Sequence, residues 1–354
     1  MICGWPLRCP LSAALCERAL RWPTIGSNVP YIMRVSRDEH HTIVVSSDSS
    51  GSRSPIRVPD EAKAKCFPKC VSWPIIHLGR RIGILQPKEE RDVMLTSRRQ
   101  RQFEEDGLLL LPDLFTAGEV ARLRAELPAL FAQDHPGNIR ERDSGEVRTA
   151  MGLHLRSESF GRLVRHPRLL EAAQQLRGDA LYVQQVKVNV KAAFEGEQWQ
   201  WHYDFATHHA EDGVPAPLAL NLHVFLDDVT EFNGPLYFIP GSHKRTSPTA
   251  TLDTETTSYP LWVVGRDSVK AMAAERGLVS ATGRAGTALI FGDAMLHASP
   301  ANISPWDRAI FSVILNPVSN ALTRHTRPDY KHHRDLTPIT ALDDDCLLQV
   351  AGAA

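Results

Sequence analysis

The side chains best suited to chemistry lie in two short stretches, "QWQWHYDF" at 198–205 and "FGDAMLHASP" at 291–300. The first stretch contains His202 and Asp204, separated by one residue at the end of a strand-like run. Period-two alternation would direct both side chains to the same face. An imidazole and a carboxylate on one face can occupy two neighbouring positions of a metal ion's coordination shell. These residues therefore predict a metal site that needs a third ligand.

His297 is the best candidate for that ligand, because it follows a strand-like run that ends at a Gly-Asp turn. Two histidines and one carboxylate on one face of a metal leave three positions open, which is the arrangement of non-haem Fe(II) oxygenases. Those positions suit a bidentate keto acid and dioxygen. Arg308 stands eleven residues after His297, and its planar guanidinium matches a carboxylate in bidentate geometry.

Each of these features has an ordinary alternative. An H-x-D pair is frequent by chance, and Arg308 alone would be typical of a surface ion pair. The adjacent His208 and His209 raise the alternative of a zinc hydrolase, but no H-x-H or H-E-x-x-H spacing accompanies them. The combination of both histidines, the carboxylate and the arginine favours the iron site.

The elements that must position these residues are strands. From Leu181 onward, short β-rich runs are bounded by Gly, Pro, Asn and Asp, and no helices are expected between them. Such a series predicts an antiparallel sandwich or barrel rather than a parallel βαβ sheet. The runs are "LYVQQVKVNVKAAF", "LALNLHVFL", "GPLYFIPGSH", "GTALIFGD" and "RAIFSVILNPV".

Helices are expected before this β region. The stretch "SRRQRQFEEDG" has helical composition and ends at Gly107, "LLLLPDLF" is a short apolar run, and Thr116 with Glu119 forms a capping box. The entry to the domain is therefore predicted to be a helix, an extended segment and a second helix. The predicted fold is mainly β, with flanking N-terminal helices.

The composition limits the partners. Forty basic and forty-one acidic side chains give a net charge of −1, so no excess of positive charge indicates nucleic acid or an anionic membrane. No apolar run approaches the ~18 residues of a membrane span. We expect a cytoplasmic protein, a monomer or homodimer, with a small-molecule partner.

Residues 1–93 differ from the rest. They are rich in Pro, Arg and Ser and keep no hydrophobic period for long. We expect either a disordered extension or translated sequence upstream of the true start, followed by a catalytic domain over 94–354. Five of the six cysteines lie in this region, which is not the distribution of a disulfide framework. Cys66 and Cys70 with His77 lack the remaining ligand of a structural zinc site.

Residues 185–244 and 291–317 together resemble the phytanoyl-CoA dioxygenase superfamily of Fe(II)- and 2-oxoglutarate-dependent oxygenases. The motifs are W-H-x-D-F, E-D-G-x-P, N-G-P-L-x-x-I-P-G-S-H and H-x-S with an Arg nine residues after the Ser. Within the superfamily the sequence is most similar to the ectoine hydroxylase branch, which includes hydroxylases of free proline-like amino acids. The resemblance implies a double-stranded β-helix, or cupin-like jelly roll.

The resemblance also implies roles for individual residues. His202, Asp204 and His297 would bind Fe(II), and Arg308 would hold the distal carboxylate of 2-oxoglutarate, with O2 as second cosubstrate and ascorbate as a supporting reductant. The positions that match the family's cosubstrate pocket are Ser299, Lys191, Asn189, Gln185 and Trp199. The positions that would contact substrate are His208, Asn221, His223, Phe291, Ser312, Arg324 and Arg327.

Two of the matching motifs have an ordinary structural explanation. Asn-Gly and Pro-Gly dipeptides predict turns at Gly234 and at Pro240–Gly241. "EDGVP" at 211–215 is likewise expected to be a turn, in which Glu211 and Asp212 could brace the metal-binding loop.

Several departures from the ectoine hydroxylase pattern bear on the substrate. His208 replaces a Trp, and Asn221 and His223 replace serines, while the iron and cosubstrate positions are kept. The implied activity is hydroxylation of a free L-amino acid, with L-proline or L-pipecolate favoured. In related halogenases a small residue replaces the iron-binding Asp, so Asp204 implies hydroxylation. Ectoine 5-hydroxylation and a non-catalytic jelly-roll binding module remain the alternatives.

Overall fold

The structure, a computed structural model, describes residues 34–37, 43–46, 95–245 and 247–349. The chain divides into two units, Met1–His77 and Leu78–Ala354. In the first unit, β1 (Arg34–Arg37) pairs antiparallel with β2 (Ile43–Ser46). The predicted boundary at 93/94 and the cysteine pair considered as zinc ligands lie outside the described residues.

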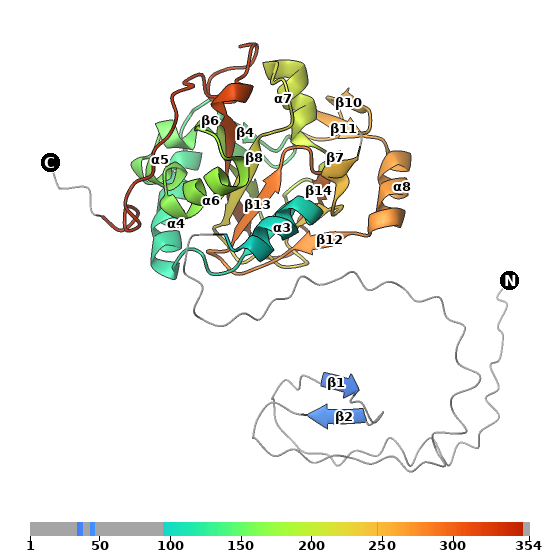
Figure 1. Ribbon diagram of the computed structural model, residues 1–354. Coiled ribbons are helices and arrows are strands. Elements are labelled where there is room, and N and C mark those ends of the chain that lie inside the picture. Colours follow the sequence, from blue (N-terminus) through green and yellow to red (C-terminus); the bar gives the residue numbers. More distant parts are fainter. Residues whose placement is uncertain (1–33, 38–42, 47–94, 246, 350–354) are drawn as a thin grey trace, which may run out of the picture. The chain divides into compact units, whose positions relative to one another are not determined.

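The second unit is built on antiparallel sheets (Figure 1). A seven-stranded sheet has the order β3-β13-β8-β15-β6-β5-β4, a four-stranded sheet has the order β12-β9-β14-β7, and β10 pairs with β11. The prediction of a mainly β, antiparallel fold is confirmed. The strands are β3 (Leu108–Leu111), β4 (Asn138–Arg140), β5 (Val147–Met151), β6 (Leu181–Lys191), β7 (Trp199–His202), β8 (Leu220–Phe225), β9 (Leu236–Phe238), β10 (Ala250–Asp253), β11 (Leu261–Val264), β12 (Val279–Ala281), β13 (Ala288–Gly292), β14 (His297–Ser299) and β15 (Arg308–Pro317).

Alternation along the central strands separates two layers of the interior. In β6, Val186 and Val188 pack with the N-terminal helices, whereas Gln185, Lys187 and Asn189 point to the other face. Because side chains alternate across a strand, the sequence "QVKVNV" creates one apolar face and one polar face. The apolar face is covered by α4 (Ala117–Phe131), α5 (Glu158–Val164) and α6 (Pro167–Arg177), which lie together on one flank in Figure 1.

The predicted entry to the domain is confirmed. Helix α3 (Ser97–Asp106) ends at Gly107, which adopts a left-handed conformation with φ of 80° and donates its N–H to Phe103. β3 follows, and α4 begins with the predicted capping box, in which Thr116 and Glu119 satisfy each other's backbone N–H groups. Gly107 closes the helix because only glycine adopts this φ without strain.

The region around the predicted metal ligands differs from the predicted secondary structure. Strand β7 ends at His202, and Asp204 begins a helix, α7 (Asp204–Asp212), where an extended strand and a turn were expected. The buried side chains of α7 are His208 and Asp212, so no apolar period marks the helix in the sequence. A further helix, α8 (Arg266–Arg276), has no fully buried side chain and escapes pattern analysis for the same reason. Helices are therefore not confined to the N-terminal part.

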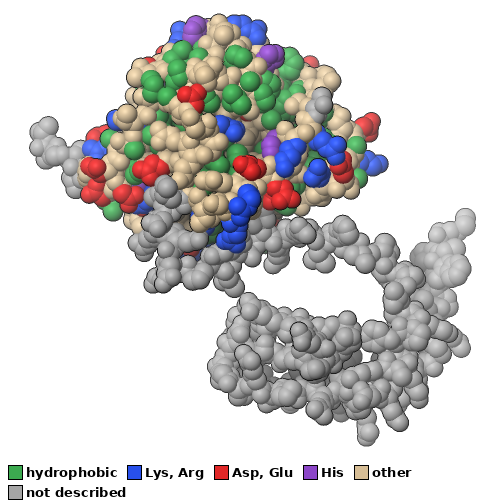
Figure 2. All heavy atoms as spheres, in the orientation of Figure 1, with side chains coloured by type: hydrophobic (Ala, Val, Ile, Leu, Met, Phe, Trp, Pro, Cys, Tyr) green, Lys and Arg blue, Asp and Glu red, His purple; other side chains and the backbone are tan. Residues whose placement is uncertain are grey.

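On the face shown in Figure 2, acidic and basic side chains lie next to one another over the described part of the domain. Among the helices described, none is both long enough and apolar enough to cross a bilayer.

Candidate active site

His202, Asp204 and His297 converge in a cavity lined by both large sheets. Strands β7 and β14 are neighbours, and their register places His202 opposite His297 with ring centroids 4.1 Å apart. The carboxylate oxygens of Asp204 lie 3.7 Å from Nε2 of His202 and 3.9 Å from Nε2 of His297. One ligand atom from each residue lies within 4.8 Å of the others, so a single ion can be bound by all three.

The backbone fixes which nitrogen of each histidine faces the ion. Nδ1 of His202 lies 2.6 Å from the carbonyl of Gln200, and Nδ1 of His297 lies 2.9 Å from the carbonyl of Met295. Because a carbonyl only accepts, each Nδ1 donates its proton and each Nε2 keeps a free lone pair. Burial lowers the pKa of His202 to about 3, which keeps the ring neutral. Two neutral imidazoles and one carboxylate are the donor set of a facial Fe(II) site.

Most of the predicted site residues line this cavity. They come from β6, β7, β8, β13, β14 and β15, from α7, and from a segment after β15 that returns over the cavity. The predicted residues found in the lining are His202, Asp204, His297, Arg308, Ser299, Asn189, Gln185, Trp199, His208, Asn221, His223, Phe291 and Arg327.

Three predicted residues do not line the cavity. Lys191 is fully buried at the end of β6, where its ammonium donates to the carbonyls of Glu197 and Pro300. Ser312 is fully buried between Lys187 and His223, which lie opposite it on the adjacent strands. Arg324 is exposed and donates to the carbonyl of His209. Lys191 and Arg324 are held away from the cavity lining by these hydrogen bonds to backbone carbonyls.

The cavity carries an excess of positive charge. Lys187, Arg308 and Arg327 line it, while Asp204 is the single carboxylate among the described lining residues. Arg308 is 2% exposed, and within the described part of the chain its guanidinium makes no hydrogen bond. Burial lowers the pKa of Arg308 to about 9. Since a buried cation is costly without an anionic partner, this cavity is suited to bind anions.

Sequence analysis missed several lining residues. Lys187 lies between Gln185 and Asn189 at period two on the same strand face, so the alternation that identified those residues also marks Lys187. Thr149 and Met151 of β5 lie opposite Asn189 and Lys187 in the sheet register. No sequence signal marks Thr207, on α7, or Tyr259, in the loop before β11. The remaining lining residues are Leu236, Leu261, Ala298 and Ile310.

Asp212 anchors the segment that carries Arg327. Its carboxylate is fully buried and accepts hydrogen bonds from Arg327 Nε at 2.8 Å and Arg327 Nη2 at 2.5 Å. The other partner is His332, whose Nδ1 lies 2.6 Å from the carboxylate. The backbone carbonyl of Asp212 also accepts from the N–H groups of Thr323 and Arg324. Asp212 is therefore the link between the C-terminal end of α7 and the segment above the cavity, in place of the predicted turn.

Replacing Asp212 with asparagine should destabilise the fold by about 3 kcal/mol, because it leaves a buried guanidinium without its anion. Despite burial, the bonds from His332 and Arg327 lower the pKa of Asp212 to about 2 from 3.8. That pKa difference contributes about 2 kcal/mol to the free energy of unfolding. The contribution is fully present above pH 4 and is lost as the pH falls through 2. Denaturant unfolding should therefore show a difference in the free energy of unfolding between wild type and Asp212→Asn that becomes smaller below pH 4. The exposed Asp267→Asn is the control, and a gap that does not change with pH would contradict this role.

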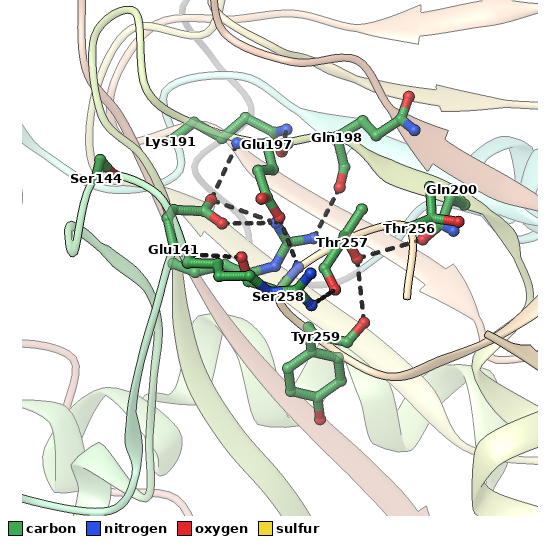
Figure 3. A network of polar contacts seen from close by, with 12 residues as sticks. Glu141, Ser144, Lys191, Glu197, Gln198, Gln200, Thr256, Thr257, Ser258 and Tyr259 are labelled. Carbon is green, nitrogen blue, oxygen red and sulfur yellow. Dashed lines mark hydrogen bonds and ion pairs between the residues drawn. The ribbon is translucent and has the colours of Figure 1, made fainter. Parts of the chain in front are cut away.

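A network of ion pairs and hydrogen bonds that includes Glu141, Glu197 and Ser258 (Figure 3) lies next to Trp199. Arg148 donates to Glu141 at 3.0 Å and to Glu197 at 2.9 Å, and its guanidinium lies 4.0 Å from the centroid of the Trp199 ring. Glu197 also accepts the backbone N–H of Ser258 at 2.7 Å, next to Tyr259. The rings of Trp199 and Tyr259 are 5.2 Å apart. The network thus connects β5, β7 and the loop before β11 behind two aromatic lining residues.

Residues 103–310 match the sequence profile of the phytanoyl-CoA dioxygenase (PhyH) family, and this range contains the three converging side chains and Arg308. The chain belongs to the phytanoyl-CoA dioxygenase family. The proteins similar to this dioxygenase have names of more than one specificity. It is 38% identical to the L-proline trans-4-hydroxylase of Streptomyces griseoviridis over 256 residues, 70% of this chain and 96% of that protein. It is 37% identical to the ectoine dioxygenase of Bordetella bronchiseptica over 240 residues, 64% of this chain and 77% of that protein.

Solved structures agree with this assignment of the fold. The dioxygenase aligns with EctD from S. alaskensis with bound Fe at a TM-score of 0.62 and 32% identity, over 74% of this chain and 92% of that one. The form of EctD with 2-oxoglutarate and 5-hydroxyectoine aligns at a TM-score of 0.61, over 74% of this chain and 91% of that one. The antiparallel sheets therefore belong to the jelly-roll fold that the resemblance implied.

Proposed function

We propose that this dioxygenase hydroxylates a free L-amino acid, with L-proline or a related cyclic amino acid as substrate. In the balanced reaction, dioxygen places one atom in the new hydroxyl group and the other in succinate, while 2-oxoglutarate loses CO2. The observation that carries the proposal is the cavity in which Lys187, Arg308 and Arg327 lie around the His-Asp-His site, whose Asp204 is the single carboxylate among the described lining residues. The positive charge suits two anionic compounds, the cosubstrate and an amino acid.

His202, Asp204 and His297 would hold Fe(II), which when bound supplies the activation of dioxygen. His202 lies at the end of β7, Asp204 at the start of α7 and His297 at the start of β14. The backbone bonds at both Nδ1 atoms pre-orient the imidazoles, so little reorganisation is needed when the ion binds.

Arg308 would take the distal carboxylate of 2-oxoglutarate. It is a buried guanidinium without a hydrogen-bond acceptor among the described residues, and it can form two parallel charge-assisted bonds to a carboxylate. Ser299, Asn189 and Gln185 line the same cavity, and Trp199 is held in its wall by the stacked Arg148. Residues with fixed side chains are suited to hold the cosubstrate in one orientation.

Lys187 and Arg327 would take the substrate carboxylate. Burial lowers the pKa of Lys187, and its ammonium donates to Gln185 Oε1 at 2.8 Å. The positive charge of Arg327 lowers the pKa of Lys187 further, because two nearby cations repel each other. A bound carboxylate between them would relieve this repulsion. The L-proline trans-4-hydroxylase relative, matched over 96% of its length, supports an amino acid.

Ectoine is the second candidate, because ectoine dioxygenases match this chain at similar identity. Asn221 and His223 line the cavity. We favour an amino acid because these polar side chains can form hydrogen bonds with its charged groups. A non-catalytic binding module is disfavoured, since three converging candidate ligands and a buried arginine whose Nε makes no hydrogen bond to the described residues are costly features without iron chemistry.

The test is a substrate panel. The protein is incubated with Fe(II), ascorbate and 2-oxoglutarate, and L-proline, L-pipecolate, other L-amino acids and ectoine are supplied separately. We expect a mass gain of one oxygen atom, with matching succinate, for a cyclic amino acid. Product from ectoine alone would replace the proposal by its alternative, and no product from any amino acid would contradict it.

A further inference from the structure

The buried stripe of α7 is polar over its whole length. Asp204, His208 and Asp212 are four residues apart, so they lie on one face of the helix at intervals of about 6 Å. Burying polar side chains is unfavourable unless each has a partner. Asp204 converges with the two metal-ligating histidines, and Asp212 pairs with Arg327 and His332. The middle residue, His208, is 2% exposed and lines the cavity.

The partner of His208 is Asp293. This residue follows β13, its side chain is fully buried, and its Oδ2 lies 3.5 Å from Nδ1 of His208. Its other oxygen, Oδ1, has no hydrogen-bond partner in the described part of the protein. Burial raises the pKa of Asp293, while the hydrogen bond with His208 and the nearby positive charge of Arg177 act in the opposite direction.

The backbone of Asp293 already makes the contacts that the fold needs. Its N–H donates to the carbonyl of Ala219 at 3.1 Å, and its carbonyl accepts the N–H of Phe205 at 3.0 Å. These bonds connect α7 to the turn after β13 whatever side chain is present at 293. Apart from its contact with His208, the buried carboxylate at this position adds cost without adding a structural connection, which points to a role through His208.

We propose that Asp293 is a positioning residue that holds His208 with Nδ1–H toward itself, so that Nε2 accepts a hydrogen bond from the amino group of the substrate. No partner of Nε2 is found among the described residues, and His208 faces the cavity one helical turn from Asp204 and one from Asp212. Along one face of α7, Asp204 would then bind the metal, His208 would bind the substrate amino group, and Asp212 would anchor the carboxylate-binding Arg327. The inference rests on the proposed amino-acid substrate and specifies how its amino group is recognised.

Asp293→Asn tests the proposal. An amide at 293 can donate to Nδ1, which would leave Nε2 protonated and unable to accept from an ammonium. We expect KM for the amino acid to rise about 10- to 100-fold, the effect of losing a hydrogen bond to a charged group, with kcat at saturation and KM for 2-oxoglutarate nearly unchanged. A carboxylate analogue that lacks the amine, cyclopentanecarboxylate for L-proline, should inhibit wild type and variant equally.

A second pair of variants tests His208 independently of Asp293. His208→Leu removes the acceptor and should raise KM as much as Asp293→Asn, and the two changes together should not add. His208→Gln keeps an acceptor oxygen, so its KM should be lower than that of His208→Leu and insensitive to Asp293→Asn. The exposed His209→Gln, on the next residue of α7, is the matched control and should behave as wild type.

The outcomes separate this inference from the proposed function. Unchanged KM in both Asp293→Asn and His208→Leu, or an equal loss of affinity for the amine-free analogue, would overturn the inference while the proposed function stands. A wild-type protein that converts no amino acid would overturn both.

Discussion

Replacing Asp204 with alanine should reduce 2-oxoglutarate turnover at least about a hundredfold, because loss of even an indirect partner of a metal ligand typically costs 10- to 100-fold. The carboxylate supplies the anionic ligand of the His-Asp-His site, with oxygens 3.7 and 3.9 Å from the two Nε2 atoms. His202→Ala should have the same effect. Succinate formation measures the loss, and calorimetric titration with Fe(II) under anaerobic conditions should show weakened metal binding.

The control for this prediction is His209→Ala. His209 lies on the same helix as Asp204 but is exposed and outside the cavity lining, so turnover should stay at the wild-type rate. Turnover that survives in Asp204→Ala and His202→Ala would mean that the ligands are wrongly assigned.

Replacing Arg308 with glutamine should raise KM for 2-oxoglutarate about a hundredfold. Truncating one member of a buried, hydrogen-bonded charge pair typically costs 2 to 5 kcal/mol, and about 2.7 kcal/mol corresponds to a hundredfold change. Arg308→Lys keeps the charge but not the bidentate geometry, so its KM for 2-oxoglutarate should lie between those of wild type and Arg308→Gln. KM for the amino acid, measured at saturating 2-oxoglutarate, should change little.

Stability distinguishes this ligand role from a structural one. In the unliganded protein Arg308 is a buried cation whose guanidinium makes no hydrogen bond to the described residues. Arg308→Gln should therefore leave the unliganded protein as stable as wild type, or more stable. A destabilised variant with unchanged KM for 2-oxoglutarate would show that Arg308 serves the fold instead.

Local patterns in the sequence predicted the strands well. The alternation of polar and apolar residues in "QVKVNV" indicates which face of β6 packs against the helices and which face lines the cavity. The capping box at Thr116 and the glycine at 107 likewise act within a few residues, so their signals are complete in the sequence. The convergence of His202 and Asp204 could be predicted for a similar reason, because they lie two residues apart in the chain.

The rest of the site depends on contacts between distant segments. Asp212 and Arg327 are 115 residues apart in the chain, and nothing local to either indicates that they pair. Asp204 was expected on a strand but begins α7, where an acidic side chain suits the helix N-terminus. The helix itself was missed because its buried stripe is polar, which removes the apolar period on which such predictions depend.

The most direct test of the proposed function uses labelled dioxygen. The protein is incubated with Fe(II), 2-oxoglutarate and L-proline under 18O2, and both products are analysed by mass spectrometry. The proposal predicts one labelled oxygen atom in hydroxyproline and one in succinate, in equal amounts, with both products absent in Asp204→Ala. Labelled succinate without any hydroxylated amino acid, across proline and its cyclic relatives, would contradict it.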